Sequence, residues 1–190
     1  MPRSKDLEAT QERLSAAVWA VLAERGPAGL TVRAVAERAG CSTGLVLHTF
    51  RDKRALLAHA RVVLHERTAR RADAAETGDD ALSAVLLGAL LLTEEKRDEA
   101  RVWVGFLAEA LADPALAALH TEYNRAFVSR LERLVTAVRP DWDAGRLSNV
   151  AKQLVALVEG LNALAAIDAE TYDVDTQRVA IRAALDRALA

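Results

Sequence analysis

Cysteine, aromatic residues and helix-breaking residues are all scarce in this chain of 190 residues. The single cysteine, Cys41, excludes an internal disulfide framework and a cysteine-rich metal site. Aromatic residues make up 4% of the chain, and with few β-branched residues this excludes a sandwich or barrel. Nine glycines and four prolines leave few breaks. Alanine, the strongest helix former, accounts for 40 residues, so the composition predicts an all-α fold.

Long apolar runs and catalytic motifs are also missing. The longest apolar run, residues 84–92, has nine residues, whereas a membrane span needs about 20. The N-terminus has no apolar segment of a secretory signal, so we expect a cytoplasmic protein without membrane contact. The chain has no glycine-rich phosphate loop, HExxH motif or nucleophile elbow, and its four histidines lack metal-ligand spacing. We therefore expect no enzyme, no metal and no cofactor.

Positive charge is concentrated near the N-terminus. Residues 1–71 hold 13 Lys and Arg against seven Asp and Glu, whereas residues 72–190 hold 12 against 20. A basic first third on an acidic remainder suggests that only the first third meets a polyanion. The alternative is chance patterning on a helical surface.

Apolar periodicity, capping residues such as Thr31, Ser42 and Asp52, and glycine or proline stops predict nine helices. The first ends before Gly26 and Pro27, and the fifth is apolar almost all round, so we expect it to be buried. The sixth begins in an acidic run, residues 94–99, that we expect to be solvated. The expected ranges are about 7–25, 32–39, 43–50, 53–75, 81–92, 93–111, 114–138, 144–167 and a last helix capped by Asp173 or Asp175.

Residues 30–57 have the pattern of a helix-turn-helix. Gly40 tolerates the positive φ that the turn needs, and Ala36 is small enough for two helices to cross. Val35, Ala39, Cys41 and Val46 occupy the packing positions. The second helix is short and begins with small polar residues, which suits entry into the major groove of DNA. The alternative is an ordinary helical hairpin with a glycine turn.

These segments resemble the TetR family of transcriptional regulators. The resemblance rests on AAVWAVLAERG, LTVRAVAERAGCSTG and HTF followed by Asp52-Lys53. Farther along, EEKRDEARVWVGFLAEALADPALAALH and LVALVEGL resemble the choline-responsive, BetI-like branch. The resemblance implies a DNA-binding head over residues 1–52, a linking helix over 53–75 and a ligand-binding and dimerisation domain over 76–190.

The resemblance also implies roles for residues of the head. Lys53 and Thr31 are expected to contact DNA phosphates, whichever bases are present. One residue departs from the family pattern: Leu47 stands where most members have an aromatic residue, usually Tyr, that touches the DNA backbone. His48 and Thr49 are expected to compensate. The expected DNA-binding residues are Thr31, Ser42, Thr43, Gly44, Leu45, His48, Thr49 and Lys53.

An effector pocket is expected among the fifth to eighth helices. Its candidate residues are apolar residues of the helix stripes and polar residues beside them, which need partners when buried. The apolar positions are also those of an ordinary core. Because the stripes carry no Lys or Arg, we expect a neutral or cationic effector, with Trp103 as a cation–π face. The candidates are Trp103, Phe106, Glu109, His120, Tyr123, Asn124, Phe127, Val158 and Asn162.

The family resemblance implies a homodimer, since a palindromic operator is read by two heads. The eighth helix has apolar and small residues over about half its circumference, which predicts two buried faces. The expected interface residues are Ala156, Gly160, Ala163, Leu164, Ile181 and Leu185. The sequence thus predicts a homodimeric repressor released from its operator by a small molecule. The alternative is a helical dimer, a carrier or adaptor, that has lost DNA binding.

Overall fold

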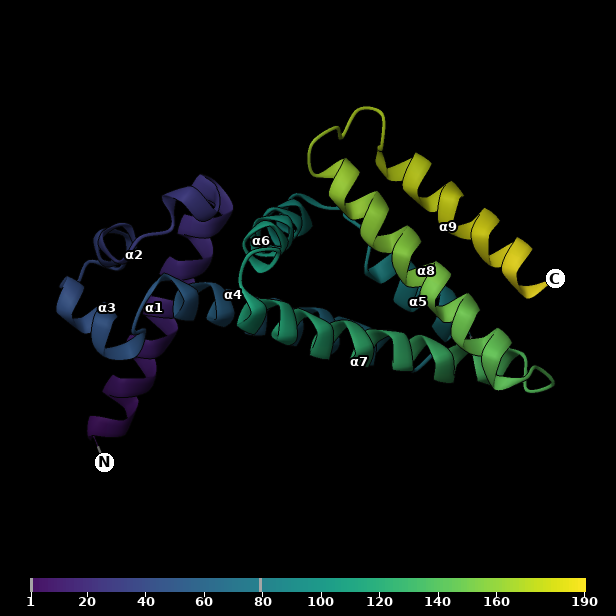
Figure 1. Ribbon diagram of the computed structural model, residues 1–190, viewed down its shortest axis with the longest axis horizontal. Coiled ribbons are helices and arrows are strands. Elements are labelled where there is room, and N and C mark those ends of the chain that lie inside the picture. The colour runs from purple at the N-terminus through teal and green to yellow at the C-terminus, as the bar shows by residue number, and fades with distance from the viewer. Residues whose placement is uncertain (1, 79) are drawn as a thin grey trace. The chain divides into compact units, whose positions relative to one another are not determined.

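The computed structural model describes residues 2–78 and 80–190, without the side chains of residues 2–7, 94 and 95. Within these ranges the protein contains nine α-helices and no β-strand, which confirms the predicted all-α class (Figure 1). The helices are α1 (Pro2–Gly29), α2 (Val32–Ala39), α3 (Thr43–Thr49), α4 (Lys53–Ala75), α5 (Ala81–Gly88), α6 (Glu94–Ala110), α7 (Pro114–Val138), α8 (Ala144–Ala165) and α9 (Val174–Leu189). None of these helices is long and apolar enough to cross a membrane.

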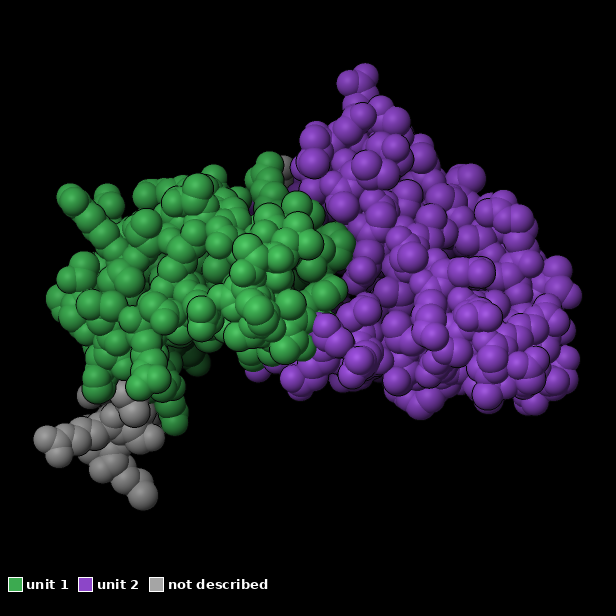
Figure 2. Space-filling view, viewed as in Figure 1, with its two compact units in different colours: residues 1–64, 101–120 green, residues 65–100, 121–190 purple. Residues whose placement is uncertain are grey.

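The chain forms two compact units (Figure 2). Unit 1 comprises residues 1–64 and 101–120, and unit 2 comprises residues 65–100 and 121–190. Each unit is therefore built from two separate stretches of the chain. The helices α4, α6 and α7 each contribute residues to both units.

The core of unit 1 forms around the apolar stripe of α1. Leu14, Val18, Val21 and Leu22 on this stripe are completely buried, as their helical spacing predicts. Val35 of α2 and Val46 of α3 join the same cluster. So do residues of α6 and α7, namely Val102, Phe106, Ala110 and Leu116.

Gly26 breaks α1 where the sequence indicates a stop. Its φ of 64° and ψ of −175° lie outside the helical region, yet helical structure resumes at Pro27 and continues to Gly29. The expected end of the first helix at Arg25 is therefore wrong by four residues. Pro27 lies against Gly105 of α6, where a Cβ atom would come within 3.0 Å of the proline ring. A glycine at position 105 thus allows the close approach of α6 within unit 1.

Unit 2 is centred on α8, whose Ala151, Leu154 and Val158 are almost fully buried. The helices α8 and α9 lie side by side (Figure 1). The predicted fifth helix is four residues too long, because α5 ends at Gly88. Leu90 and Leu91 nevertheless remain buried outside the helix, so the apolar run marks core residues rather than a longer helix.

Charged side chains also connect the helices of unit 2. The guanidinium of Arg71 on α4 pairs with Glu99 of α6, which is only 4% exposed. Our expectation that the acidic run of residues 94–99 is solvated is therefore wrong at Glu99. Arg130 of α7 binds Asp73 at 2.7 Å and Glu76 at 2.5 Å.

At the turn between α7 and α8, two guanidinium groups lie over the ring of Trp142. Those of Arg139 and Arg146 are 4.5 and 3.7 Å from the centre of its ring.

Gly40 makes the turn between α2 and α3 possible. Its φ of 62° and ψ of 42° lie in the left-handed region, and its N–H donates to carbonyl oxygens of α2. A Cβ atom at this position would meet no atom within 4 Å, so the constraint is conformational rather than steric.

Replacing Gly40 with Val should therefore lower the free energy of unfolding by about 1–2 kcal/mol. Gly40→Asn should cost less, because Asn tolerates the left-handed region. Urea denaturation followed by circular dichroism measures both variants. Equal losses in the two variants would show that backbone conformation at residue 40 is not the limiting factor.

Candidate nucleic-acid interface

The helix-turn-helix is held by capping hydrogen bonds that the sequence predicts. Thr31 Oγ1 accepts from the N–H of Ala34 at 3.1 Å, and Ser42 Oγ accepts from the N–H of Leu45 at 3.3 Å. Asp52 caps α4 in the same way, accepting from the N–H of Ala55 at 2.9 Å. These bonds fix where α2, α3 and α4 begin, so they orient the exposed surface of α3 in unit 1.

One side of α3 packs inward and the other is exposed. Val46 is completely buried and Leu45 is half-buried against the core of unit 1. The hydroxyl of Thr49 donates to the carbonyl of Leu45 at 3.2 Å, so it is bonded within the helix. The residues exposed on α3 are Thr43, Gly44, Leu47, His48 and Thr49.

Lys53, the expected phosphate contact, is paired with a carboxylate of its own chain. It is the first residue of α4, and its Nζ donates to Glu109 Oε1 of α6 at 3.0 Å. Both side chains are partly exposed, at 42% and 36%. The pair lies within unit 1 and joins one expected DNA-binding residue to one expected effector-binding residue. Sequence spacing gave no sign of this contact between residues 56 positions apart.

A second ion pair lies beside the first. Arg54 Nε donates to Asp113 Oδ2 at 2.6 Å. Desolvation opposes ionisation of Asp113, but the N–H groups of Ala115 and Leu116 and the charge of Arg54 outweigh it and lower the pKa of this carboxyl. Both cations at the start of α4 are therefore bound to carboxylates from the end of α6 and the start of α7.

The remaining effector candidates of unit 1 have different surroundings. Phe106 is completely buried in the core formed around α1, whereas Trp103 is half-buried. His120 is half-buried, and burial together with the nearby charge of Arg61 lowers its pKa, which favours the neutral ring at pH 7. Arg61 is itself 7% exposed, and its position on α4 gave no indication of this burial in the sequence.

In unit 2, two candidate asparagines have buried oxygens with no hydrogen-bond donor. Asn162 Nδ2 donates to the carbonyl of Ala89 at 2.9 Å, which fixes the orientation of its amide. Its Oδ1 and the Oδ1 of Asn124 are buried and accept no hydrogen bond.

Three further effector candidates also lie in unit 2. Tyr123 stacks on His65, with ring centres 4.0 Å apart and an interplanar angle of 7°. Val158 is buried in the core of unit 2, and Phe127 packs against this core.

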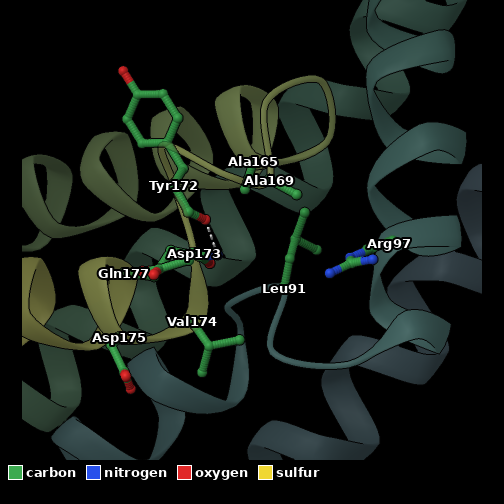
Figure 3. A pocket seen from close by; sticks show the side chains of 9 residues that line it. All are labelled: Leu91, Arg97, Ala165, Ala169, Tyr172, Asp173, Val174, Asp175 and Gln177. Carbon is green, nitrogen blue, oxygen red and sulfur yellow. Dashed lines mark hydrogen bonds between the residues drawn. The ribbon is translucent and has the colours of Figure 1, made fainter.

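A cavity of about 210 Å³ lies in unit 2 around the loop between α8 and α9 (Figure 3). Gln177 is 2% exposed, and its Nε2 donates to the carbonyl of Tyr172 at 2.8 Å, while its Oε1 accepts no hydrogen bond. None of the nine expected effector-binding residues lines this cavity. Its lining residues are Leu91, Arg97, Ala165, Ala169, Tyr172, Asp173, Val174, Asp175 and Gln177.

The expected dimer residues fall into two groups. Ile181 and Leu185 of α9 are 0% and 8% exposed, because they pack inside unit 2 of their own protomer. Ala156, Gly160 and Leu164 of α8 are exposed, and Ala163 is half-buried. Helical periodicity identified the apolar residues but could not separate those that face the protomer core from those that face outward.

The chain matches two family models that together span most of its length. Residues 14–60 match "Bacterial regulatory proteins, tetR family", and residues 78–190 match "BetI-type transcriptional repressor, C-terminal". The HTH-type transcriptional regulator BetI of Stenotrophomonas maltophilia is 34% identical over 166 residues, covering 85% of this chain and 83% of the relative. The chain belongs to the BetI-type branch of the TetR family.

Solved structures of similar regulators share the fold. A transcriptional regulator from Rhodococcus sp. Rha1 is 31% identical, with a TM-score of 0.84 over 94% of this chain and 95% of its own. A putative transcriptional regulator from Saccharomonospora viridis, solved in complex with choline, has the same TM-score at 20% identity over 94% and 96% of the two chains. The protein is thus a DNA-binding transcriptional regulator and not an enzyme, which supports the main prediction over the carrier or adaptor.

Glu109 should compete with DNA phosphate for Lys53. Glu109→Gln should raise affinity for duplex DNA by up to about fivefold, since a partly exposed ion pair contributes up to about 1 kcal/mol. Lys53→Ala should weaken specific and non-specific binding alike and reduce the salt slope by about one. Fluorescence anisotropy with labelled duplexes at several salt concentrations measures both effects.

The control for the added positive charge is Glu122→Gln, an exposed carboxylate of α7. In a Lys53→Ala background, Glu109→Gln should have no more effect than this control. A full gain of affinity in that background would mean that Glu109 acts through general charge and not through Lys53.

Proposed function

We propose that the protein is a homodimeric repressor that binds a palindromic or near-palindromic operator in the cytoplasm and is released by a small molecule. The observation that carries the proposal is the exposed α3, presented by a capped helix-turn-helix whose neighbours supply cations. In the proposed complex α3 enters the major groove with its N-terminal residues toward the bases.

The proposed DNA contacts divide by chemistry. Thr31, Ser42 and Lys53 lie at helix N-termini, where hydroxyl, N–H and ammonium groups suit phosphate oxygens. Lys53 exchanges Glu109 for a phosphate when DNA binds. Contacts with base edges are assigned to Thr43, Gly44 and Leu45 at the start of α3. His48 and Thr49 are assigned to the backbone contact that Leu47 does not make.

The proposed dimer forms through the outward faces of α8 and α9. Ala156, Gly160 and Leu164 of α8 are exposed at helical spacing, and Ile167 beyond the end of that helix is 85% exposed. On α9, Val179 is 66% exposed. Exposed apolar side chains next to small residues favour close packing against a second copy of the same helices. Pairing of this kind sets the distance between two heads, which must match half-sites about 34–36 Å apart.

Gly160→Glu provides a test of this dimer. A Cβ atom at residue 160 meets nothing within 4 Å in the protomer, so the fold of one protomer should tolerate the substitution. In the dimer the carboxylate would be buried without a partner, and dimerisation should weaken at least tenfold. Sedimentation velocity over a concentration series measures the change, and operator affinity should fall with it.

Ala126→Glu, which adds the same charge at an exposed position of α7, is the matched control and should leave the dimer intact. A Gly160→Glu protein that sediments as the wild type would place the interface elsewhere.

We propose a neutral or cationic effector. The buried oxygens of Asn124 and Asn162, which have no donor in unit 2, support a ligand that donates hydrogen bonds. The solved relative in complex with choline, a cation with one hydroxyl group, supports the same charge class. Glu109 is occupied by Lys53, so we assign it to that ion pair instead of to the effector. Trp103 belongs to unit 1, and its role as a cation–π face stays a prediction from the sequence.

Three ligands of similar shape can separate the charge classes: choline, its neutral isostere 3,3-dimethylbutan-1-ol, and the anion 3,3-dimethylbutanoate. We expect choline or the neutral alcohol, and not the anion, to release a bound duplex selected from random sequence. Release is followed by anisotropy and binding by tryptophan fluorescence. Release by the anion alone would contradict the proposed charge class.

Asn162→Leu should weaken the response at least tenfold, because the variant lacks the oxygen that the ligand satisfies. Asn149→Leu, at an exposed position of the same helix, is the control. An unchanged response in Asn162→Leu would remove Asn162 from the effector site.

A further inference from the structure

The α3 helix lacks the side chains that most often distinguish guanine and adenine. Its sequence, TGLVLHT, contains no Arg, Lys, Asn or Gln. Arg and Lys bind guanine, and Asn and Gln bind adenine, through paired hydrogen bonds in the major groove. Three polar side chains are exposed on α3: those of Thr43, His48 and Thr49. The hydroxyl of Thr49 already donates a hydrogen bond within the helix, which leaves Thr43 and His48 for the bases. Side-chain hydrogen bonds from α3 can therefore contribute little to distinguishing one base pair from another.

What α3 exposes instead is apolar surface. Leu47 is 48% exposed, although the adjacent Val46 is completely buried and already anchors the helix to the core of unit 1. Leu47 lies one helical turn after Thr43 and Gly44, and helical side chains lean toward the N-terminus. Leu47 therefore lies on the same face of α3 as Thr43, and its isobutyl group leans toward that turn. At Gly44 a Cβ atom would have only Ser42 Oγ at 3.8 Å nearby, so a DNA base can approach the helix closely there.

The charges around this apolar surface favour a nucleic acid as its occupant. Residues 43–49 contain no acidic side chain, and Arg51, Asp52, Lys53 and Arg54 follow. Lys53 and Arg54 are paired with carboxylates in the free protein, and these partly exposed pairs can exchange their carboxylate for a phosphate. A polyanion that also displays methyl groups complements both the basic residues and the apolar surface. In the major groove of DNA such a methyl group is the C5-methyl of thymine, which apolar side chains contact.

We infer that Leu47, together with the methyl group of Thr43, recognises thymine methyl groups and makes the operator half-site selective for A·T pairs at the positions under α3. Leu47 thereby acts as a specificity-determining residue, at the position where the family's usual aromatic residue contacts the backbone. This inference rests on the DNA-binding function and adds the bases that the helix prefers.

Substitution of thymine by deoxyuracil tests the inference, because it removes only the methyl group. Duplexes are first selected from a random pool with the wild-type protein, and each thymine of the selected half-site is then replaced in turn. At one or two positions the replacement should weaken wild-type binding about threefold to tenfold, as expected for a lost methyl contact. Leu47→Ala should bind the thymine duplex more weakly and respond less than twofold to the same replacements.

Two further variants test whether the deoxyuracil effect depends on the apolar side chain at position 47. Leu111→Ala removes an apolar side chain that is 91% exposed in unit 1 but lies outside the helix-turn-helix, and it should keep the full deoxyuracil effect. Leu47→Tyr keeps a large side chain and introduces the family's usual residue. It should lose the deoxyuracil effect and gain a hydrogen bond to phosphate, which raises affinity for every duplex and leaves the salt slope unchanged, because the neutral phenol releases no counterion. Circular dichroism confirms that each variant is folded.

The possible failures are distinguishable. If the wild-type protein selects no duplex, the proposed operator binding itself is wrong. If it selects a sequence but tolerates deoxyuracil at every position, or if Leu47→Ala keeps the wild-type deoxyuracil effect, DNA binding stands and the role of Leu47 is overturned. Capture of a protein by the exposed Leu47 with no change in DNA selectivity on mutation would likewise overturn it.

Discussion

The apolar core around α1 is the constraint on which the rest of unit 1 depends. Its buried leucines and valines hold α2 and α3 in place, and Phe106 of α6 completes the cluster from a distant part of the sequence. Full burial of a side chain of this size contributes about 1.5–3 kcal/mol. The position of the recognition helix is thus energetically linked to a helix of the C-terminal half of the chain. The ion pairs of Lys53 and Arg54 connect the same two regions at the surface.

Hydrophobic packing and charge pairing have different roles in this arrangement. The core contacts around Phe106 require close fit and are lost together when they open. The ion pairs at the start of α4 are partly exposed, are weakened by salt and can exchange one anion for another at little cost. A protein that releases and rebinds a polyanion gains from this division. Its recognition helix stays rigidly supported while its phosphate-binding cations remain exchangeable.

Local features were predictable from the sequence, and long-range contacts were not. The bounds of residues 32–39, 53–75 and 114–138 and the caps at Thr31, Ser42 and Asp173 depend on neighbouring residues alone, and the structure confirms them. Periodicity also identified Phe106 as inward-facing, but it gives the apolar side of a helix and not the element packed against it. For the same reason the partners of Glu99 and Glu109 were missed, since each binds a cation 28 or 56 residues away. The burial of Ile181 required knowledge of how α8 and α9 pair.

The sharing of α4, α6 and α7 between the two units has a consequence for protein engineering and for evolution by recombination. Consider a chimeric regulator that joins the first 60 residues of one relative to the remainder of another. Its α1 stripe would come from one protein and its residue 106 from the other, so the two would not be matched in size and shape. Mismatched volumes there would leave a void or a clash inside the reading head. A functional exchange of heads must therefore carry the segment 101–120 with it, although that segment lies in the other half of the gene.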